Sequence, residues 1–299
     1  MPTDNAATDY PSAEPPAVLP KTPEVRAPVG ACDAHVHMLA GVAEHPLWEK
    51  RSENPADGLD FEAWLDTFLA HLNVLGCSRT LIVHSILYGT DNSVTLQAVK
   101  RLGDAARGVC LVPDDVTDAV LDDMADANMV AVRLNYVHGG VLTWDGAKAM
   151  APRLAERGMH VQMLAHADRH LEELEEDVRA MPVPVVFDHA GWPADGINPS
   201  HPGFDALTRL MADGHAYVKL SGLYRFTDSP FEASDALIDR LARANPERCL
   251  WGSDWPHIML NGAGMPDAGV LLDAFHRVVT DDVARHRILV ENPAKLFRF

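Results

Sequence analysis

Two histidines near the start of the chain are spaced so that they could share one chemical task. His35 and His37 are separated by one residue in the segment ACDAHVH, whose short apolar pattern predicts a strand. Side chains alternate along a strand, so both imidazoles are expected to project to the same side. Such a pair suits two ligands of one divalent metal ion, or two hydrogen-bond donors to one oxyanion.

Two later segments end in residues that an apolar core would not select. His189 lies in VPVVFDHAG and Asp254 lies in RCLWGSDWPH, and each segment begins as a predicted strand. We expect His189 and Asp254 to join His35 and His37 as the catalytic residues. The same four side chains are the expected ligands if a single divalent metal ion is bound.

Further polar side chains follow other predicted strands and could contact a substrate. These candidates are Arg133, Asn135, His84, Ser85, Tyr224, Arg225 and His257. Arg133 is expected to meet an anionic group, because a buried arginine without one is costly. His84 and Ser85 have a second interpretation, since they precede a loop in which Thr90 or Asp91 could cap a helix. His257 could instead pack its own loop, and Lys219 could pair with Asp188.

An alternating series of strands and helices must position these residues. The eight expected strands begin at Ala31, Arg79, Arg107, Met129, Met159, Val183, His215 and Arg248. Between them, segments such as 61–76 and 235–246 repeat apolar residues at three- and four-residue steps, as in helices with one buried face. Eight units in roughly 270 residues predict a (β/α)8 barrel, which places chemistry at the C-terminal ends of its strands. A doubly wound sheet is the alternative fold, but no G-x-G-x-x-G follows the first strand.

The charge of the chain limits its partners. Its 299 residues include 43 acidic and 25 basic side chains, a formal net charge of −18. This charge repels phosphate backbones and anionic lipids, so we expect no nucleic-acid or membrane partner. A small anionic substrate is compatible with it, provided that a few arginines form a local positive pocket.

The chain is expected to form one domain. Residues 1–28 are rich in proline, alanine and acidic residues, which predicts a flexible N-terminal arm before a single barrel at 29–299. No secretory signal is expected, because the arm lacks a basic region followed by an apolar stretch. The four cysteines have no C-x-x-C spacing, which favours buried free thiols and a cytoplasmic location. Tryptophan and leucine residues on the helices could support a homodimer.

The motifs, taken in order, resemble one enzyme family. They are CDAHVHM, HSILYGTDNSVTL, VRLNY, VFDHAGWP, YVKLSGLYR, LWGSDWPH and ENPAKLFRF. The series resembles the amidohydrolase superfamily of the amidohydrolase 2 type, and within it the 2-pyrone-4,6-dicarboxylate hydrolase-like branch of lactone hydrolases. The resemblance covers about residues 28–299, and it implies a distorted (β/α)8 barrel that opens a carboxylated lactone.

The resemblance also implies roles for individual residues. Asp254 is implied as the general base on water, the three histidines as groups that polarise the lactone carbonyl, and Arg133 and Arg225 as partners of substrate carboxylates. No cofactor is obligatory on this interpretation, and one zinc or manganese ion is the alternative. Lactone isomerisation and zinc-dependent decarboxylation are the alternative reactions. A non-catalytic binding protein would be expected to lack one of the four catalytic residues, and none is missing.

The chain departs from the pyrone-dicarboxylate hydrolases in two segments. The resemblance implies a second arginine in those enzymes at a position where residues 128–133 of this chain have a valine. It also implies a tyrosine in those enzymes that residues 160–164 lack. Both changes remove contacts to an anion, so a lactone with one carboxylate is expected, such as a sugar-acid lactone or a muconolactone relative. Arg133 and Gln162 replace residues typical of binuclear amidohydrolases, so no bridged two-metal site is expected. Partial burial is expected to raise the pKa of Asp254 toward the range of an efficient base.

Overall fold

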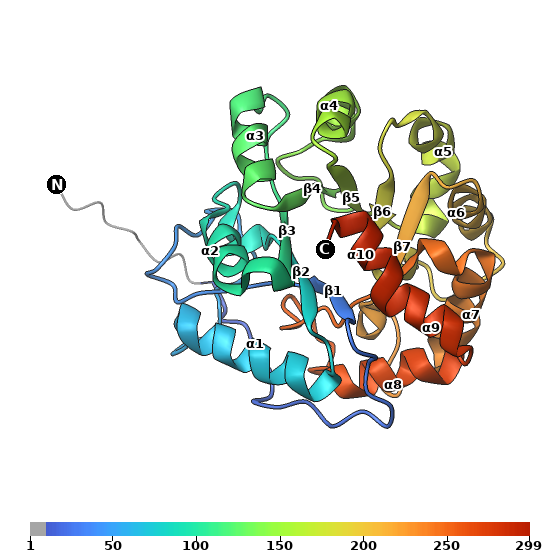
Figure 1. Cartoon of the computed structure of the whole chain (residues 1–299), viewed down its shortest axis with the longest axis horizontal. Helices are drawn as coiled ribbons and strands as arrows, with labels where there is room; N and C mark the ends of the chain where they lie inside the picture. The colour runs from blue at the N-terminus through green and yellow to red at the C-terminus, as the bar shows by residue number, and fades with distance from the viewer. Residues whose placement is uncertain (1–9) are drawn as a thin grey trace.

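The computed structural model describes residues 10–299, and a parallel barrel of eight strands lies at its centre (Figure 1). The strands are β1 (Cys32–Val36), β2 (Arg79–Val83), β3 (Ala106–Cys110), β4 (Met129–Asn135), β5 (His160–Leu164), β6 (Val185–Phe187), β7 (Ala216–Leu220) and β8 (Cys249–Trp251). Each strand pairs in parallel with the next one along the chain. The predicted (β/α)8 fold and the predicted order of the strands are therefore confirmed.

The first and last strands meet and close the barrel at its C-terminal end. Val36 forms a parallel bridge with Trp255, and the backbone N–H of His37 donates to Trp255 O at 2.7 Å. The N–H of Asp254 donates to His35 O at 2.9 Å. Backbone hydrogen bonds therefore fix the end of β1 beside the residues that follow β8.

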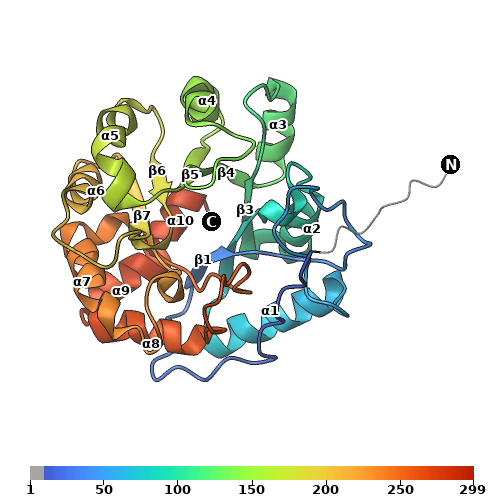
Figure 2. The same ribbon diagram turned by 180° about the vertical axis from the view of Figure 1, so that it is seen from behind.

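Helices form the outer layer around the strands (Figure 2). They are α1 (Phe61–Leu75), α2 (Ser93–Leu102), α3 (Asp118–Asp126), α4 (Trp144–Glu156), α5 (Ala167–Ala180), α6 (Pro202–Ala212), α7 (Asp235–Ala244), α8 (Ala268–Val278), α9 (Asp282–His286) and α10 (Asn292–Phe297). The first helix shows how the sequence sets these limits. Asp60 caps α1 by accepting from the N–H of Ala63, and Gly76 ends it with a φ of 90°, which a glycine adopts without steric cost.

Apolar side chains fill the N-terminal part of the barrel. Buried residues of alternate strand positions, including Ala34, Leu81 and Val109, form one cluster with Phe297 of α10. Phe297 is fully buried, and its helix lies across the end of the barrel in Figure 1. Apolar side chains therefore fill the N-terminal end of the barrel interior, and the polar residues gather at the opposite, C-terminal end.

The segment assigned to a flexible arm lies extended against the barrel from residue 10 onward. The N–H of Lys21 donates to Asp267 Oδ2 at 2.9 Å, and the N–H of Glu24 donates to Asp273 Oδ1 at 2.7 Å. Acidic side chains of the barrel therefore accept hydrogen bonds from backbone N–H groups within residues 10–28. The amino-acid composition of this segment does not reveal such hydrogen bonds. The first nine residues of the predicted arm lie outside the described residues.

Two further expectations concern membranes and thiols. Within residues 10–299, no helix has both the length and the apolar character needed to cross a bilayer. The four cysteines are buried and free, as the sequence predicted.

Candidate active site

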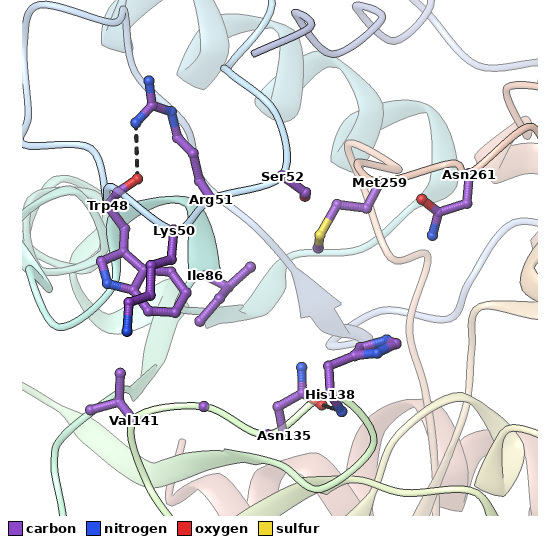
Figure 3. Close-up of a pocket in the computed structure, with 12 residues that line it drawn as sticks. Trp48, Lys50, Arg51, Ser52, Ile86, Asn135, His138, Val141, Met259 and Asn261 are labelled. Atoms are coloured by element: carbon purple, nitrogen blue, oxygen red, sulfur yellow. Dashed lines mark hydrogen bonds between the residues drawn. The ribbon is translucent and has the colours of Figure 1, made fainter. Parts of the chain in front are cut away.

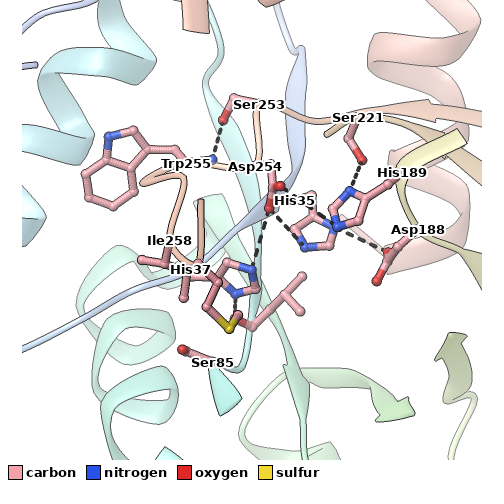
Figure 4. A network of polar contacts seen from close by, with 12 residues as sticks. His35, His37, Ser85, Asp188, His189, Ser221, Ser253, Asp254, Trp255 and Ile258 are labelled. Atoms are coloured by element: carbon pink, nitrogen blue, oxygen red, sulfur yellow. Dashed lines mark hydrogen bonds and ion pairs between the residues drawn. The ribbon is translucent and has the colours of Figure 1, made fainter. Parts of the chain in front are cut away.

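The four predicted catalytic residues meet at the C-terminal end of the barrel (Figure 4). His35 belongs to β1 and His37 follows it, while His189 and Asp254 follow β6 and β8. All four side chains are buried. His189 and Asp254 have φ values of 55° and 65°, a left-handed backbone that costs a non-glycine residue about 1–3 kcal/mol. The turns at His189 and Asp254 direct these two side chains toward His35 and His37.

Three histidine nitrogens surround the Asp254 carboxylate. The Nε2 atoms of His35 and His37 each lie 3.6 Å from Asp254 Oδ1, and His189 Nε2 lies 3.8 Å from Oδ2. Burial lowers the pKa of all three rings, to about 4 for His189. The imidazoles are therefore neutral near pH 7.

The opposite nitrogen of each ring is held by the protein. The contacts are His35 Nδ1 to Asp188 Oδ1 at 3.2 Å, His37 Nδ1 to Val83 O at 2.7 Å, and His189 Nδ1 to Ser221 Oγ at 3.1 Å. The Val83 carbonyl only accepts hydrogen bonds, so neutral His37 carries its proton on Nδ1, and its Nε2 lone pair faces Asp254. His35 Nδ1 lies between the Asp188 carboxylate, which accepts, and the Lys219 ammonium at 3.3 Å, which donates.

Asp254 is bound by the two residues that follow β7. The Tyr224 hydroxyl donates to Asp254 Oδ2 at 2.8 Å, and Arg225 donates to the same oxygen from Nε at 2.9 Å. Burial alone would raise the pKa of Asp254, but the Arg225 guanidinium and the neighbouring histidines hold it well below its usual range. The expectation of a raised pKa is therefore wrong, because the opposite charge of Arg225 outweighs desolvation. Tyr224 and Arg225, predicted to contact substrate, instead contact Asp254 in this structure.

A second set of polar residues lies beneath His35. Lys219 is fully buried and donates to Gln162 Oε1 at 2.6 Å, and its ammonium lies 3.5 Å from Asp188 Oδ1. Gln162 in turn donates to Asp188 Oδ2 at 3.0 Å. Burial lowers the pKa of Lys219 to about 8, which leaves it largely charged near neutral pH. The suggested pairing of Lys219 with Asp188 is confirmed, and this pair fixes the carboxylate that holds His35.

Two glycines make room for the histidines. A Cβ on Gly222 would lie 2.4 Å from His189 Nδ1, and a Cβ on Gly252 would lie 2.7 Å from the Cβ of His35. Side chains at either position would displace a ring of the site.

Arg133 is a predicted substrate-binding cation that pairs with no carboxylate in the part of the chain that the structure describes. Its side chain is 6% exposed, and it donates from Nη1 to His84 O at 2.7 Å. Among residues 10–299, Arg133 Nε is buried without a hydrogen-bond partner, and no carboxylate lies within ion-pair distance of the guanidinium. A buried guanidinium in this state is suited to receive an anion.

The remaining predicted residues have different surroundings. Both ring nitrogens of His84 contact protein groups, Thr95 Oγ1 at 3.0 Å and Gly89 O at 2.9 Å. Ser85 caps the short turn after β2, since its hydroxyl accepts from Leu87 N. His257 is buried against the Tyr224 ring, with 5.4 Å between centroids. These three residues are thus held in the wall of the site.

A cavity of about 710 Å³ opens above the barrel (Figure 3). It is lined by Trp48, Lys50, Arg51 and Ser52 after β1, by Ile86 after β2, by Asn135 at the end of β4 with residues 138–141 after it, and by Met259 and Asn261 after β8. A narrow second cavity shares Ile86, Asn135, Gly140 and Val141 with it and also borders Arg133. Asn135 therefore lies where the two cavities meet, beside Arg133.

The site fits one divalent cation. His35, His189 and Asp254 offer ligand atoms that all lie within 4.8 Å of one another. In the described part of the chain, His35 Nε2 and Asp254 Oδ1 are buried and lack a hydrogen-bond partner. Two unpartnered buried polar atoms that lie 3.6 Å apart require a cation or a proton between them, and two imidazoles with a carboxylate are a donor set that zinc accepts. His37, the fourth predicted ligand, approaches Asp254 Oδ1 but is not part of this group.

Several contributing residues carried no distinct signal in the sequence. Asp188 and Gln162 position His35, but in the sequence neither belongs to a motif that indicates this role. Trp48 and Lys50 line the cavity from a loop without any motif. A polar residue within an otherwise apolar strand, such as Gln162 in HVQML, was the available clue.

Comparisons with known proteins agree with this geometry. The chain is 33% identical over 276 residues to a 4-sulfomuconolactone hydrolase from Rhizobium radiobacter, which covers 90% of each chain. It is 31% identical over 291 residues to a 2-pyrone-4,6-dicarboxylate hydrolase from Comamonas testosteroni, which covers 93% of each. A crystal structure of an Agrobacterium tumefaciens protein superposes with a TM-score of 0.82 at 27% identity and covers 93% of this chain and 98% of that one.

These relatives are hydrolases of cyclic esters, and they match the chain over nearly its whole length. The family model described as amidohydrolase matches residues 32–299, which include the complete barrel and all four catalytic candidates. With that match and the site described above, the chain belongs to the amidohydrolase family.

Proposed function

We propose that the protein is a hydrolase that opens a carboxylated lactone by attack of water on the ring carbonyl. The observation that carries the proposal is the presence of two features at the C-terminal end of one barrel. One is an ionised Asp254 among three neutral histidines, and the other is the buried Arg133, which pairs with no carboxylate among residues 10–299. The first feature suits ester hydrolysis and the second suits a substrate carboxylate.

Asp254 is the proposed base, and its two oxygens have different tasks. Oδ2 already accepts from Tyr224 and Arg225, whereas Oδ1 has no hydrogen-bond partner among residues 10–299. Oδ1 accepts a proton from water as the water attacks the carbonyl carbon. The same oxygen returns the proton to the ring oxygen when the C–O bond breaks, so the carboxylate is regenerated.

His35, His37 and His189 act on the carbonyl oxygen. A divalent ion held by His35, His189 and Asp254 would polarise this carbonyl as a Lewis acid. Without the ion, an imidazole must donate a proton from Nε2 to the developing oxyanion, and this requires the other tautomer. Val83 disfavours that tautomer in His37, whereas the Lys219 ammonium can donate to His35 Nδ1 and the Ser221 hydroxyl can donate to His189 Nδ1. His35 and His189 are therefore the proposed donors in a metal-free site.

Arg133 and Asn135 bind the substrate carboxylate and its ring in this proposal. Arg225 contributes indirectly, since it fixes Asp254 and keeps its pKa low. Isomerisation and decarboxylation are less supported than hydrolysis, because the relatives at 31% and 33% identity are hydrolases.

An assay of base consumption on carboxylated lactones tests the function. Hydrolysis releases one acid equivalent per ring opened, isomerisation releases none, and decarboxylation releases carbon dioxide. Purified protein is assayed before and after chelation, and its metal content is measured. Ring opening that stops in Asp254→Asn supports the proposal, and unchanged turnover in that variant contradicts the assignment of the base.

We also propose a cytoplasmic protein that forms a homodimer. The free buried cysteines support a reducing compartment. Light scattering on the purified protein measures the mass of the particle in solution, and a value near 32.7 kDa would contradict the dimer.

A further inference from the structure

We propose that Lys219 is a positioning residue that fixes the proton of His35 on Nε2. His35 and His37 then have opposite hydrogen-bonding roles, since His37 carries its proton on Nδ1. His35 donates to the developing oxyanion, whereas the Nε2 lone pair of His37 accepts a hydrogen bond from the attacking water. This role of Lys219 rests on the proposed lactone hydrolysis and assigns the positions of its protons.

The Lys219 ammonium is enclosed and has few hydrogen-bond acceptors. Its side chain extends from β7 and is fully buried. Its hydrogen-bond partners among residues 10–299 are Gln162 Oε1 at 2.6 Å and His35 Nδ1 at 3.3 Å. An ammonium group only donates, so a proton on Nδ1 would place two donors opposite each other in a buried site. The position of Lys219 therefore favours a lone pair on Nδ1 and the ring proton on Nε2.

Asp188 is the competing partner of the same nitrogen. Its Oδ1 atom lies 3.2 Å from His35 Nδ1, but it makes no hydrogen bond in the part of the chain that the structure describes. The charge of this carboxylate is balanced by other groups, because the Lys219 ammonium lies 3.5 Å from Oδ1 and Gln162 donates to Oδ2 at 3.0 Å. Asp188 therefore does not require the proton of His35.

The opposite end of the His35 ring favours the same proton position. His35 Nε2 is buried without a hydrogen-bond partner among the described residues, and it lies 3.6 Å from Asp254 Oδ1 (Figure 4). A carboxylate attracts an N–H group and repels a lone pair, so the charge of Asp254 favours a proton on Nε2. The cation at one end of the ring and the anion at the other therefore select one tautomer.

His37 has the opposite surroundings. The Val83 carbonyl lies 2.7 Å from its Nδ1 and only accepts, so the proton stays on that nitrogen. The Nε2 lone pair lies 3.6 Å from Asp254 Oδ1, the oxygen that takes the proton from water in the proposed reaction. A water molecule bound to both atoms donates one hydrogen to each, which leaves a lone pair of its oxygen free to attack the lactone carbonyl.

The proposed proton position also affects metal binding. A metal ion needs the Nε2 lone pair, which His35 offers only when its proton moves to Nδ1, next to the Lys219 ammonium. The charge of Lys219 opposes both this shift and the approach of a divalent cation. Loss of the ammonium should therefore raise the affinity of the site for zinc.

Nuclear magnetic resonance locates the two protons directly. The full-length protein is labelled with nitrogen-15 in its histidine rings and kept in a chelator, and correlation spectra report which ring nitrogen carries the hydrogen. The variants His35→Gln and His37→Gln assign the signals. We expect the wild type to carry the proton of His35 on Nε2 and that of His37 on Nδ1. In Lys219→Met, the proton of His35 should move to Nδ1, where Asp188 can accept it, and His37 should not change.

Two further measurements use the same variant. Lys219→Met should lower kcat by about 100-fold on the lactone that is opened in the base-consumption assay, with KM within twofold, as for the loss of one oxyanion donor. Its zinc affinity, from competition with a chelator, should rise by about 10-fold. The control is Lys148→Met, which removes a lysine of α4 that pairs with Asp177, and it should match the wild type in all three measurements.

Either of two spectra would overturn the role of Lys219. One places the wild-type proton of His35 on Nδ1, and the other shows an Nε2 proton that stays in place in Lys219→Met. If this variant does not fold, the wild-type spectrum decides, since a proton on Nε2 supports the role and a proton on Nδ1 refutes it. The spectra need no substrate, so a wild type that opens no lactone contradicts the proposed function alone, and the proton positions are still decided by the spectra.

Discussion

Arg225 and Asp254 form a buried ion pair in which Nε and Nη2 of the guanidinium approach one oxygen, Asp254 Oδ2, at 2.9 and 2.8 Å. Tyr224 donates to that oxygen as well. The other oxygen, Oδ1, faces the Nε2 atoms of His35 and His37 at 3.6 Å. The carboxylate is thus anchored through one oxygen and available for chemistry through the other.

Replacement of Asp254 by asparagine should remove the base and preserve the shape of the site. We expect kcat to fall by about 1,000-fold, within the range found for general-base residues, with little change in the Kd for substrate. Stopped-time product analysis and calorimetry measure the two quantities. A comparable loss in Asp177→Asn, a partly exposed partner of Lys148 far along the sequence from the site, would indicate that the effect is not specific to the base.

Replacement of Arg225 by methionine should destabilise the protein as well as impair catalysis. Removal of one partner leaves the Asp254 charge buried with fewer compensating contacts, which costs about 3 kcal/mol of unfolding free energy. Urea titrations compare this variant with Arg225→Lys, which keeps the charge. If the two variants are equally stable, the ion pair does not contribute in the way described.

Asp188→Asn should weaken the site without a direct contact to the reacting atoms. The carboxylate lies 3.2 Å from His35 Nδ1 and orients the ring, and comparable changes behind a ligand reduce metal affinity or activity by about 10–100-fold. The measurement is competition for zinc against a chelator, followed by kcat with and without added metal. Wild-type zinc affinity together with wild-type kcat in this variant would disprove the positioning role.

Tyr10→Ala should affect the substrate affinity rather than the chemical step. The ring of Tyr10 stacks on Arg51, and its hydroxyl donates to Glu49 O, so the substitution releases the loop that lines the cavity. We expect KM to rise by about fivefold with kcat within twofold of the wild type, because a mobile loop must be ordered on binding. Tyr10→Phe, which keeps the stacked ring, is the matched control. A fall in kcat at constant KM would contradict the prediction.

His160 should make stability depend on pH. Burial and the nearby Lys219 lower its pKa in the folded protein to about 3, against roughly 6.5 in an unfolded chain. Its contribution is therefore fully present above pH 6.5 and is lost as the pH falls from 6.5 toward 3, by up to about 1.4 kcal/mol per unit. In His160→Phe, unfolding free energy should fall less steeply from pH 7 to pH 4. The exposed His286→Phe is the control, and identical slopes in all three proteins would refute this effect.

The sequence predicted the barrel and the central cluster because both depend on local patterns. Strand and helix periods alternate along the chain, and residues at the C-terminal ends of parallel strands must meet at one end of a barrel. This rule was sufficient to bring His35, His37, His189 and Asp254 together. It did not require knowledge of any side-chain conformation.

Pairing between side chains could not be derived in the same way. Arg225 and Tyr224 were placed at the correct end of the barrel, but their choice of Asp254 as partner depends on rotamers and on the turn after β7. The sign of the pKa shift of Asp254 followed from that choice. Burial and opposite charge act in contrary directions, and only the geometry shows that charge prevails.

The contact between residues 10–13 and the loop after β1 has a practical consequence for how the protein is prepared. An affinity tag fused to the N-terminus is attached to the segment that leads into this contact, and the contact lies on the loop that forms part of the cavity wall. The C-terminal Phe299 packs instead on Arg79 and Arg107, at the starts of β2 and β3 on the opposite end of the barrel. Kinetic constants from N-terminally tagged protein are therefore comparable with others only after the tag has been removed.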